Sequence, residues 1–287
     1  GASDMALVEY GGAGSNTWRE NRVVRNFDKT PTGLLVSNAD IFQSSGVEVG
    51  PLVEDNEFTY AGDDCMNIHN YISVVIRLDS TDPRRALVLD GVGEADMTGE
   101  GYAWHQRLNT FSRVTSGDVV RVYDSHNRSA TMGLHLTTVV REVNESLALA
   151  DLQAANATLV QMGLIKVQRN WVGELRVYWV TLLDPIPHEA LPRALLNIDR
   201  LSGQGAVVRR NYLLGCNSVH FKSIGGRVTA NRFNHTGGVG ILIWPQWLEG
   251  SVGLRDVSVT DNVFYNHQVQ VTVGPGTHNI TVARNHA

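Results

Sequence analysis

The sequence predicts an all-β protein in which a parallel β-helix is interrupted by an inserted antiparallel β-barrel-like domain. A short pattern, valine and two further residues before an asparagine, recurs around Asn211, Asn231 and Asn262, with weaker copies at Asn26, Asn56 and Asn285. The steps from 211 to 231 and from 262 to 285 are 20 and 23 residues, and the step from 231 to 262 is 31 residues, one coil plus a loop. A β-rich repeat of this length is typical of a parallel solenoid, in which each repeat forms one coil.

The composition favours the same class. Only 18% of the 287 residues are charged and 28 are glycines, which suits an all-β chain with many turns better than a helical one. The net charge of −5 offers no basic surface for nucleic acid, and no apolar stretch is long enough for a membrane-spanning helix. We therefore expect neither nucleic acid among the partners nor a membrane span.

Residues 1–70 are expected to form the first part of the β-helix. Their short β-rich runs are bounded by Gly, Asn, Asp and Ser, which favour turns, and cover 23–24, 33–36, 47–49 and 66–69. In the last run, Met66 and Ile68 alternate with Asn67 and His69. Alternation places the apolar pair inside the coil, so Asn67 and His69 are expected to face outward.

Residues 71–196 lose the repeat and are expected to form the inserted domain. Longer alternating runs joined by turns favour a small antiparallel barrel or sandwich, and they cover 71–78, 85–89, 117–123, 133–143, 164–168 and 174–183. Residues 145–163 have helical propensity.

Residues 197–287 return to the coil pattern and are expected to form the second part of the β-helix. The expected strands cover 206–211, 218–222, 226–230, 240–243, 257–260, 269–273 and 279–282. With the insertion left out, 218–222 follows the coil of residues 63–69. His220 and Lys222 then face outward if Val219 and Phe221 face inward.

Three aspartates are the candidate catalytic residues. Asn38-Ala39-Asp40 is followed by Asp63-Asp64, and Asp40 and Asp63 are 23 residues apart. If 23 residues make one coil, these carboxylates stack on neighbouring strands about 4.8 Å apart and lie roughly 5 to 9 Å from each other, as in pairs that hydrolyse glycosidic bonds. Like charges raise the pKa of one member and keep it protonated. Turn capping and Ca²⁺ binding are the alternatives for these residues.

Other polar and aromatic residues are candidates to bind a sugar substrate through hydrogen bonds or ring stacking. They are Asn38, Gln43, Asn67, His69, His220, Lys222, Trp244 and Trp247. No Cys/His cluster has the spacing of a zinc site, and the glycine pairs lack the context of a nucleotide-binding loop. We expect neither a metal nor an organic cofactor.

Cys65 and Cys216 lie on either side of the middle segment. Two buried thiols on stacked coils are the expected state. A disulfide that clamps the base of the inserted domain is the alternative.

The segment Asn38-Ala39-Asp40, followed by Gly62-Asp63-Asp64 and a β-rich insertion, resembles glycoside hydrolase family 110, whose members remove α-1,3-linked galactose. Gly-Asp-Asp-Cys alone is also similar to the polygalacturonases of family 28. The first resemblance implies a right-handed parallel β-helix and inverting hydrolysis without a cofactor, with the three aspartates sharing the acid and base roles. Where that family tends to have Gly and His after the first aspartate, this chain has Ile41 and Gln43.

The expected function is hydrolysis of α-linked galactose or a related sugar by two carboxylates, with a carbohydrate as partner. One alternative is a polysaccharide lyase in which the aspartates hold Ca²⁺ and Lys222 or an arginine is the base. The other is a non-catalytic carbohydrate-binding or structural β-helix, which Ile41 and Gln43 favour.

Five Asn-x-Ser/Thr sequons, at Asn127, Asn144, Asn156, Asn234 and Asn279, favour a secreted or envelope-associated protein. The sequence begins and stops within the repeat pattern. A fragment, or ends covered by another chain as in a homo-oligomer, is therefore expected.

Overall fold

The computed structural model describes residues 5–25, 35–70, 72–92, 113–124, 131–142, 177–186, 194–234, 238–244 and 253–287. Within these ranges the regular structure is almost entirely strand, with short 3₁₀ segments such as η5 (Asp199–Leu201), so the predicted all-β class is confirmed. The chain divides into two compact units, the first built from Gly1–Asn70, Arg200–Pro245 and Gly253–Ala287, and the second mainly from Tyr71–Asp199.

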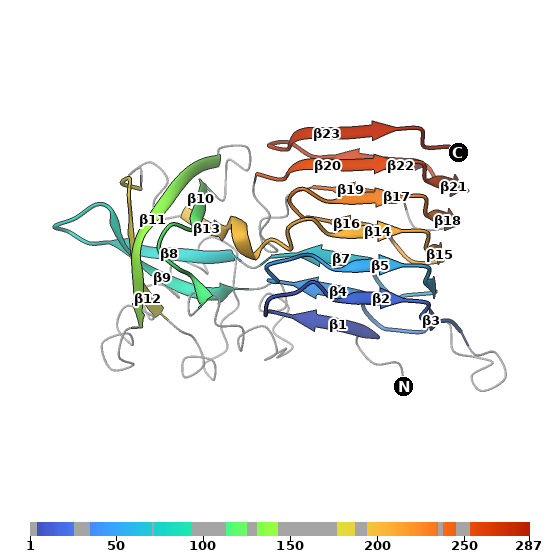
Figure 1. Ribbon diagram of the computed structural model, residues 1–287, viewed down its shortest axis with the longest axis horizontal. Coiled ribbons are helices and arrows are strands. Elements are labelled where there is room, and N and C mark those ends of the chain that lie inside the picture. Colours follow the sequence, from blue (N-terminus) through green and yellow to red (C-terminus); the bar gives the residue numbers. More distant parts are fainter. Residues whose placement is uncertain are drawn as a thin grey trace. The chain divides into compact units, whose positions relative to one another are not determined.

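The first unit contains three sheets in which every strand pair is parallel (Figure 1). The first sheet has the order β1 (Leu7–Tyr10), β4 (Phe42–Ser45), β7 (Met66–His69), β16 (Val219–Phe221), β19 (Val239–Ile243), β22 (Val269–Val273). The second has the order β2 (Thr17–Arg19), β5 (Leu52–Glu54), β14 (Val207–Arg209), β17 (Arg227–Thr229), β20 (Arg255–Thr260), β23 (His278–Ala283). The third has the order β21 (Val263–Tyr265), β18 (Arg232–Asn234), β15 (Tyr212–Leu214), β6 (Glu57–Thr59), β3 (Arg22–Val23). The chain visits the three sheets in turn.

A ladder of asparagines lines the corner between the second and third sheets. From the second member onward, each side-chain oxygen accepts a hydrogen bond from the backbone N–H of the previous member at 2.9 to 3.0 Å, along the series Asn21, Asn56, Asn211, Asn231, Asn262, Asn285. The residue before each member has a positive φ between 53° and 59°, which turns the chain through the corner. Asparagine suits this buried position because its short side chain both donates and accepts.

The recurring asparagine pattern therefore marks a structural corner. The ladder begins at Asn21, whereas the pattern predicts Asn26 as its first member. Asn26 lies outside the described residues.

Columns of apolar side chains fill the space between the sheets. Val53, Val208, Val228 and Val259 lie opposite one another in the second sheet and are fully buried. Phe233 and Phe264 stack with ring centroids 4.7 Å apart in the third sheet. In the first sheet Phe42, Met66, Val219 and Ile241 form the matching column. Residues of like kind stack because the parallel registers place the same inward position of neighbouring strands side by side.

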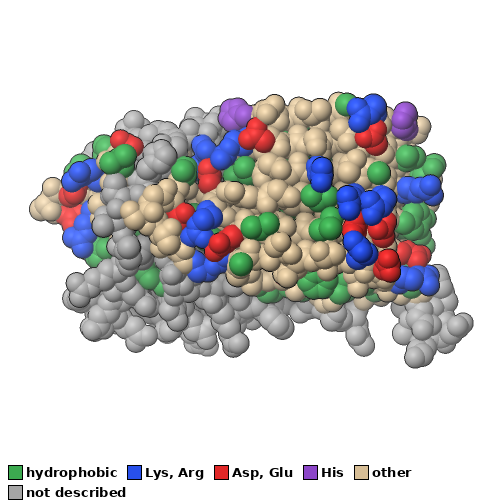
Figure 2. All heavy atoms as spheres, in the orientation of Figure 1, with side chains coloured by type: hydrophobic (Ala, Val, Ile, Leu, Met, Phe, Trp, Pro, Cys, Tyr) green, Lys and Arg blue, Asp and Glu red, His purple; other side chains and the backbone are tan. Residues whose placement is uncertain are grey.

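Charged side chains gather over the ends of β2, β5 and β14 (Figure 2). Glu54, whose side chain is fully buried, accepts hydrogen bonds from Arg209 Nε at 2.6 Å and from Arg210 at 2.7 Å, and it also pairs with Arg19. The hydrogen bond from Arg209 holds the pKa of Glu54 below its usual value. The cluster joins three layers of the second sheet.

The second unit contains a closed barrel of six antiparallel strands. Around the barrel the order is β10 (Val119–Asp124), β11 (Thr131–Glu142), β12 (Val177–Leu182), β9 (Arg85–Val92), β8 (Ile72–Leu78), β13 (Ala194–Ile198). Ala86, Val88, Val120 and Val180 are fully buried in it. On β12, Trp179 lies beneath the guanidinium groups of two arginines, 4.9 Å and 4.5 Å from its ring centroid.

Some expected elements differ from those observed. Residues 47–49 form no strand, and Val49 makes only isolated bridges, because the chain turns there before Gly50 and Pro51. The strand expected at 33–36 is absent where it is described, at 35–36. The strand expected at 164–168 and the helix expected at 145–163 lie outside the described residues. No helix in the described ranges is long and apolar enough to cross a membrane.

Candidate active site

Two turns meet beside the first sheet and bring the acidic residues together. Ser37 and Ala61 form a parallel bridge, and the Gly62 N–H donates to the Ser37 carbonyl oxygen at 2.9 Å. A Cβ atom on Gly62 would lie 2.3 Å from the Asn38 carbonyl oxygen. Any side chain at position 62 would push the turns apart, so the contact requires glycine.

Strand register decides which aspartates face each other. Phe42 of β4 lies opposite Met66 of β7, an offset of 24 residues. The same offset places Asp64 opposite Asp40, and the Asp64 N–H donates to Asp40 Oδ1 at 3.3 Å. The expected spacing of 23 residues is therefore one residue shorter than the observed register at this place.

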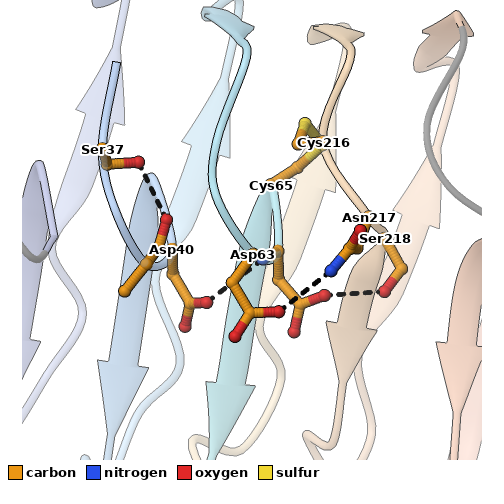
Figure 3. Close-up of a disulfide and its surroundings, with 9 residues drawn as sticks. Ser37, Asp40, Asp63, Cys65, Cys216, Asn217 and Ser218 are labelled. Atoms are coloured by element: carbon orange, nitrogen blue, oxygen red, sulfur yellow. Dashed lines mark hydrogen bonds between the residues drawn. A yellow bond between two sulfur atoms is a disulfide. The ribbon is translucent and has the colours of Figure 1, made fainter. Parts of the chain in front are cut away.

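The three aspartates form a compact cluster, and Figure 3 labels two of them, Asp40 and Asp63. Asp40, Asp63 and Asp64 each contribute a carboxylate oxygen that lies within 4.8 Å of the other two. Asp40 and Asp64 are each only 5% exposed, whereas Asp63 is exposed. One solvent-facing carboxylate thus lies beside two buried ones, and we call these three residues the acid cluster.

Burial makes the two inner carboxyl groups hold their protons. It raises the pKa of Asp40 to about 7, with a further increase from the charge of Asp63. Burial, followed by the charges of Asp40 and Asp63, raises the pKa of Asp64 to about 8. The low-dielectric surroundings disfavour the charged form, and neighbouring like charges add to the effect. A proton is therefore present on the buried pair near neutral pH.

The segment after Cys216 supplies hydrogen bonds to the acid cluster. Ser218 Oγ donates to Asp64 Oδ1 at 2.9 Å, and Asn217 Nδ2 donates to Asp63 Oδ1 at 3.0 Å (Figure 3). Cys65 and Cys216 form a disulfide with a Cα–Cα distance of 5.2 Å. The expectation of two free thiols is therefore wrong, because the register of the two turns brings these residues within bonding distance.

Gln43 and His69 bind each other. His69 Nδ1 lies 2.7 Å from the Asn70 carbonyl oxygen, so it carries the proton and Nε2 accepts. Nε2 lies 2.9 Å from Gln43 Nε2 and 2.8 Å from Ser45 Oγ, and Gln43 Oε1 accepts from the Tyr10 hydroxyl at 2.9 Å. Both side chains are 4% exposed. These contacts give them a role within the sheet and little surface for a sugar.

Asn67 and Lys222 are also buried. Lys222 is 0% exposed and donates to Asn67 Oδ1 at 3.2 Å, although the alternation of its strand predicts an outward side chain. Its charge lowers the pKa of Asp40 and Asp64, against the larger effect of burial. Lys222 therefore acts as a buried counter-charge to the acid cluster.

His220 is half-buried, and its Nδ1 lies 3.1 Å from Asp64 Oδ2. This nitrogen directly faces the acid cluster. Among the predicted sugar-binding residues, His220 and Asn67 thus each contact a candidate catalytic group, since the Asn67 side chain hydrogen-bonds Asp40.

The remaining predicted residues are placed differently. Asn38 is exposed on the turn that carries Asp40. Trp244 is half-buried and packs so closely on Gly274 that a Cβ atom there would lie 2.6 Å from its ring. Trp247 lies outside the described residues. Ile41 is fully buried in the hydrophobic core, so its side chain does not add bulk to the acid cluster.

The oxygens of the acid cluster are close enough together to surround a cation. The buried ammonium group of Lys222, however, already supplies positive charge to the two inner carboxylates. We therefore do not assign the cluster as a metal site.

Sequence reasoning did not identify Asn217, Ser218 or Tyr10 as site residues. Asn217 and Ser218 directly follow Cys216, just as Asp63 and Asp64 directly precede Cys65. A disulfide between Cys65 and Cys216, the alternative that the sequence allows, places these two segments together. No comparable signal marks Tyr10.

No protein-family model matches the chain, and no curated protein matches it. The acid cluster is therefore interpreted from its own geometry.

Proposed function

We propose that the protein is a glycoside hydrolase that cleaves α-linked galactose or a related sugar with the acid cluster. The observation that carries the proposal is the pairing of two buried carboxyl groups, Asp40 and Asp64, with the exposed carboxylate of Asp63. Glycoside hydrolysis needs an acid to protonate the leaving oxygen and a second carboxylate to activate water or attack the sugar. The buried pair provides the proton, and Asp63 faces the solvent from which water arrives.

We also propose that the first unit is a right-handed parallel β-helix. Support comes from the three parallel sheets that the chain visits in turn and from the asparagine ladder that joins successive layers. Parallel strand crossovers are right-handed in nearly all proteins. This geometry stacks side chains of successive layers, which is how the acid cluster is assembled from separate turns.

An inverting mechanism is proposed from the resemblance to family 110. The separation of at most 4.8 Å between the nearest oxygens of the acid cluster is short for an inverting pair, whose carboxyl groups are typically about 6.5 to 9.5 Å apart. The anomer of the first product decides between inversion and retention.

A lyase is less well supported. Lys222, the predicted base, is fully buried and hydrogen-bonded to Asn67. A base must lie within hydrogen-bond reach of the proton that it removes. In the sequence, a non-catalytic β-helix is favoured by Ile41 and Gln43. Ile41 lies in the core, away from the acid cluster, so only Gln43 still favours that alternative.

The test is turnover of aryl α-galactosides and α-linked galactosyl oligosaccharides, with the product anomer followed by NMR. Asp40→Asn, Asp63→Asn and Asp64→Asn should each lower kcat by about 10² to 10⁴. Asp256→Asn, an exposed position on β20, is the matched control and should retain activity. Absence of turnover by the folded wild-type protein on every sugar would refute the proposal.

We further propose that the protein acts in a secreted or envelope-associated setting. The Cys65–Cys216 disulfide supports this location, because disulfides persist in oxidising compartments.

A further inference from the structure

We propose that Ser218 and Asn217 are positioning residues for the acid cluster, and that the Cys65–Cys216 disulfide holds them there. Both residues hydrogen-bond a carboxylate of the cluster directly, and the disulfide joins the residue before Asn217 to the residue after Asp64. The proposal rests on the proposed function, and it adds Ser218 and Asn217 as residues that control the acid cluster.

The two segments are distant in the sequence and adjacent in the structure. The bonded cysteines are separated by 151 residues, and the whole of Tyr71–Asp199 lies between them in the chain. Backbone hydrogen bonds join the segments: the Asn217 N–H donates to the Asp63 carbonyl oxygen at 2.9 Å, and the Ser218 carbonyl oxygen accepts from the Cys65 N–H at 2.8 Å and from the Met66 N–H at 3.4 Å. The disulfide is the covalent member of this junction (Figure 3).

Burial distinguishes the two hydrogen bonds. Ser218 is 5% exposed and donates to the buried Asp64, so its hydroxyl opposes the effect of burial on that carboxyl group. Asn217 is exposed and donates to the exposed Asp63. An exposed carboxylate rotates freely unless it is held, so Asn217 fixes the orientation of the group that faces the solvent. Ser218 therefore adjusts the proton affinity of the Asp64 carboxyl group, and Asn217 fixes the orientation of the Asp63 carboxylate.

Ser218→Ala tests the first part. Loss of one hydrogen bond to a carboxylate should raise the pKa of Asp64 by about one pH unit. The alkaline limb of the kcat/KM profile should shift upward with it, and kcat should fall about tenfold while KM stays unchanged, because Ser218 need not touch the substrate. Ser218→Thr keeps the hydroxyl and should restore the profile.

Ser223→Ala is the matched control. Ser223 is fully buried in the same unit, and its hydroxyl bonds the Gly203 carbonyl oxygen and the Ala206 N–H rather than an aspartate. This variant loses a buried hydroxyl and should leave the pH profile in place. An unchanged profile and unchanged carboxyl titration in Ser218→Ala would overturn the proposal.

The double variant Cys65→Ala, Cys216→Ala tests the role of the disulfide. Its aspartate carboxyl groups, followed by ¹³C NMR titration, should show an upward shift in the same direction as in Ser218→Ala. A folded double variant with the wild-type titration would overturn the disulfide's role, and the Ser218 variants decide the remainder if the double variant does not fold. The titration needs no substrate, so it judges this proposal even if the wild-type protein turns over no sugar.

Discussion

Replacing Asp40 by asparagine should stabilise the protein at high pH and change little at low pH. The pKa of the Asp40 carboxyl group rises from 3.8 to about 7 in the folded state, mainly through burial. The folded state therefore holds this proton more tightly than the unfolded chain. Stability is fully retained below about pH 4 and is lost as pH rises through about 7.

The magnitude follows from the shift. A difference of about 3 pH units at about 1.4 kcal/mol per unit makes ionisation in the folded state cost about 4 kcal/mol. Asparagine remains neutral at every pH, and its Oδ1 can still accept the hydrogen bond from the Asp64 N–H. We expect Asp40→Asn to exceed the wild type by about 2 to 4 kcal/mol at pH 9 and to equal it within about 1 kcal/mol at pH 4.

Urea denaturation between pH 4 and pH 9, followed by circular dichroism, measures this difference as a change in midpoint at constant m value. Asp256→Asn is the control, because its carboxylate is exposed on β20. If the advantage of Asp40→Asn were the same at pH 4 and pH 9, burial of an ionisable carboxyl group would not be its cause. Loss of activity together with a gain in stability would show that the acid cluster is retained for function.

Further predictions concern activity, the disulfide and the asparagine ladder. Asp40 and Asp64 lose their protons between about pH 7 and about pH 8, so kcat/KM should fall about tenfold per pH unit above this range. A kcat/KM that stays constant to pH 9.5 would contradict the role of these residues as the acid. The double variant Cys65→Ala, Cys216→Ala should lower the free energy of unfolding by up to about 5 kcal/mol, because the disulfide closes a loop spanning a sequence separation of 151 residues. Urea denaturation measures the loss of stability, and intact-mass detection of alkylated thiols in the wild type checks that the disulfide is formed. Asn231→Ala should cost about 3 kcal/mol, because it leaves the Asn211 N–H and the Val208 carbonyl group without their buried partners. Asn234→Ala, which loses a long hydrogen bond of 3.3 Å to the Tyr212 hydroxyl from a half-buried position of β18, should cost less than about 1 kcal/mol in the same denaturation assay.

Local sequence pattern determined the all-β class and the layers of the first unit. The spacing of Asn211, Asn231 and Asn262 equals the register between their strands, because each asparagine must present its donor and acceptor to the next at the same corner. Alternation likewise identified the inward residues Met66 and Ile68. These features repeat along the chain, so they are visible without the structure.

The acid cluster was predictable as a group, since Asp40 and the Asp63-Asp64 pair lie about one coil apart. Its internal arrangement was not. Which aspartate faces Asp40 depends on a register of 24 residues, and a shift of one residue exchanges the buried and exposed members. Turn length sets that register, and the repeat alone did not specify it.

Only the tertiary structure decided the partners of the candidate sugar-binding residues. Alternation predicts whether a side chain leaves the core, but it does not predict what covers that side chain afterwards. Lys222 and His69 leave the core face and are nevertheless buried, each with its own hydrogen-bond partner. The disulfide and the contacts of Asn217 and Ser218 join segments that come before and after residues Tyr71–Asp199 in the sequence. Such contacts depend on how segments that are distant in the sequence pack together. A local sequence pattern does not predict that packing.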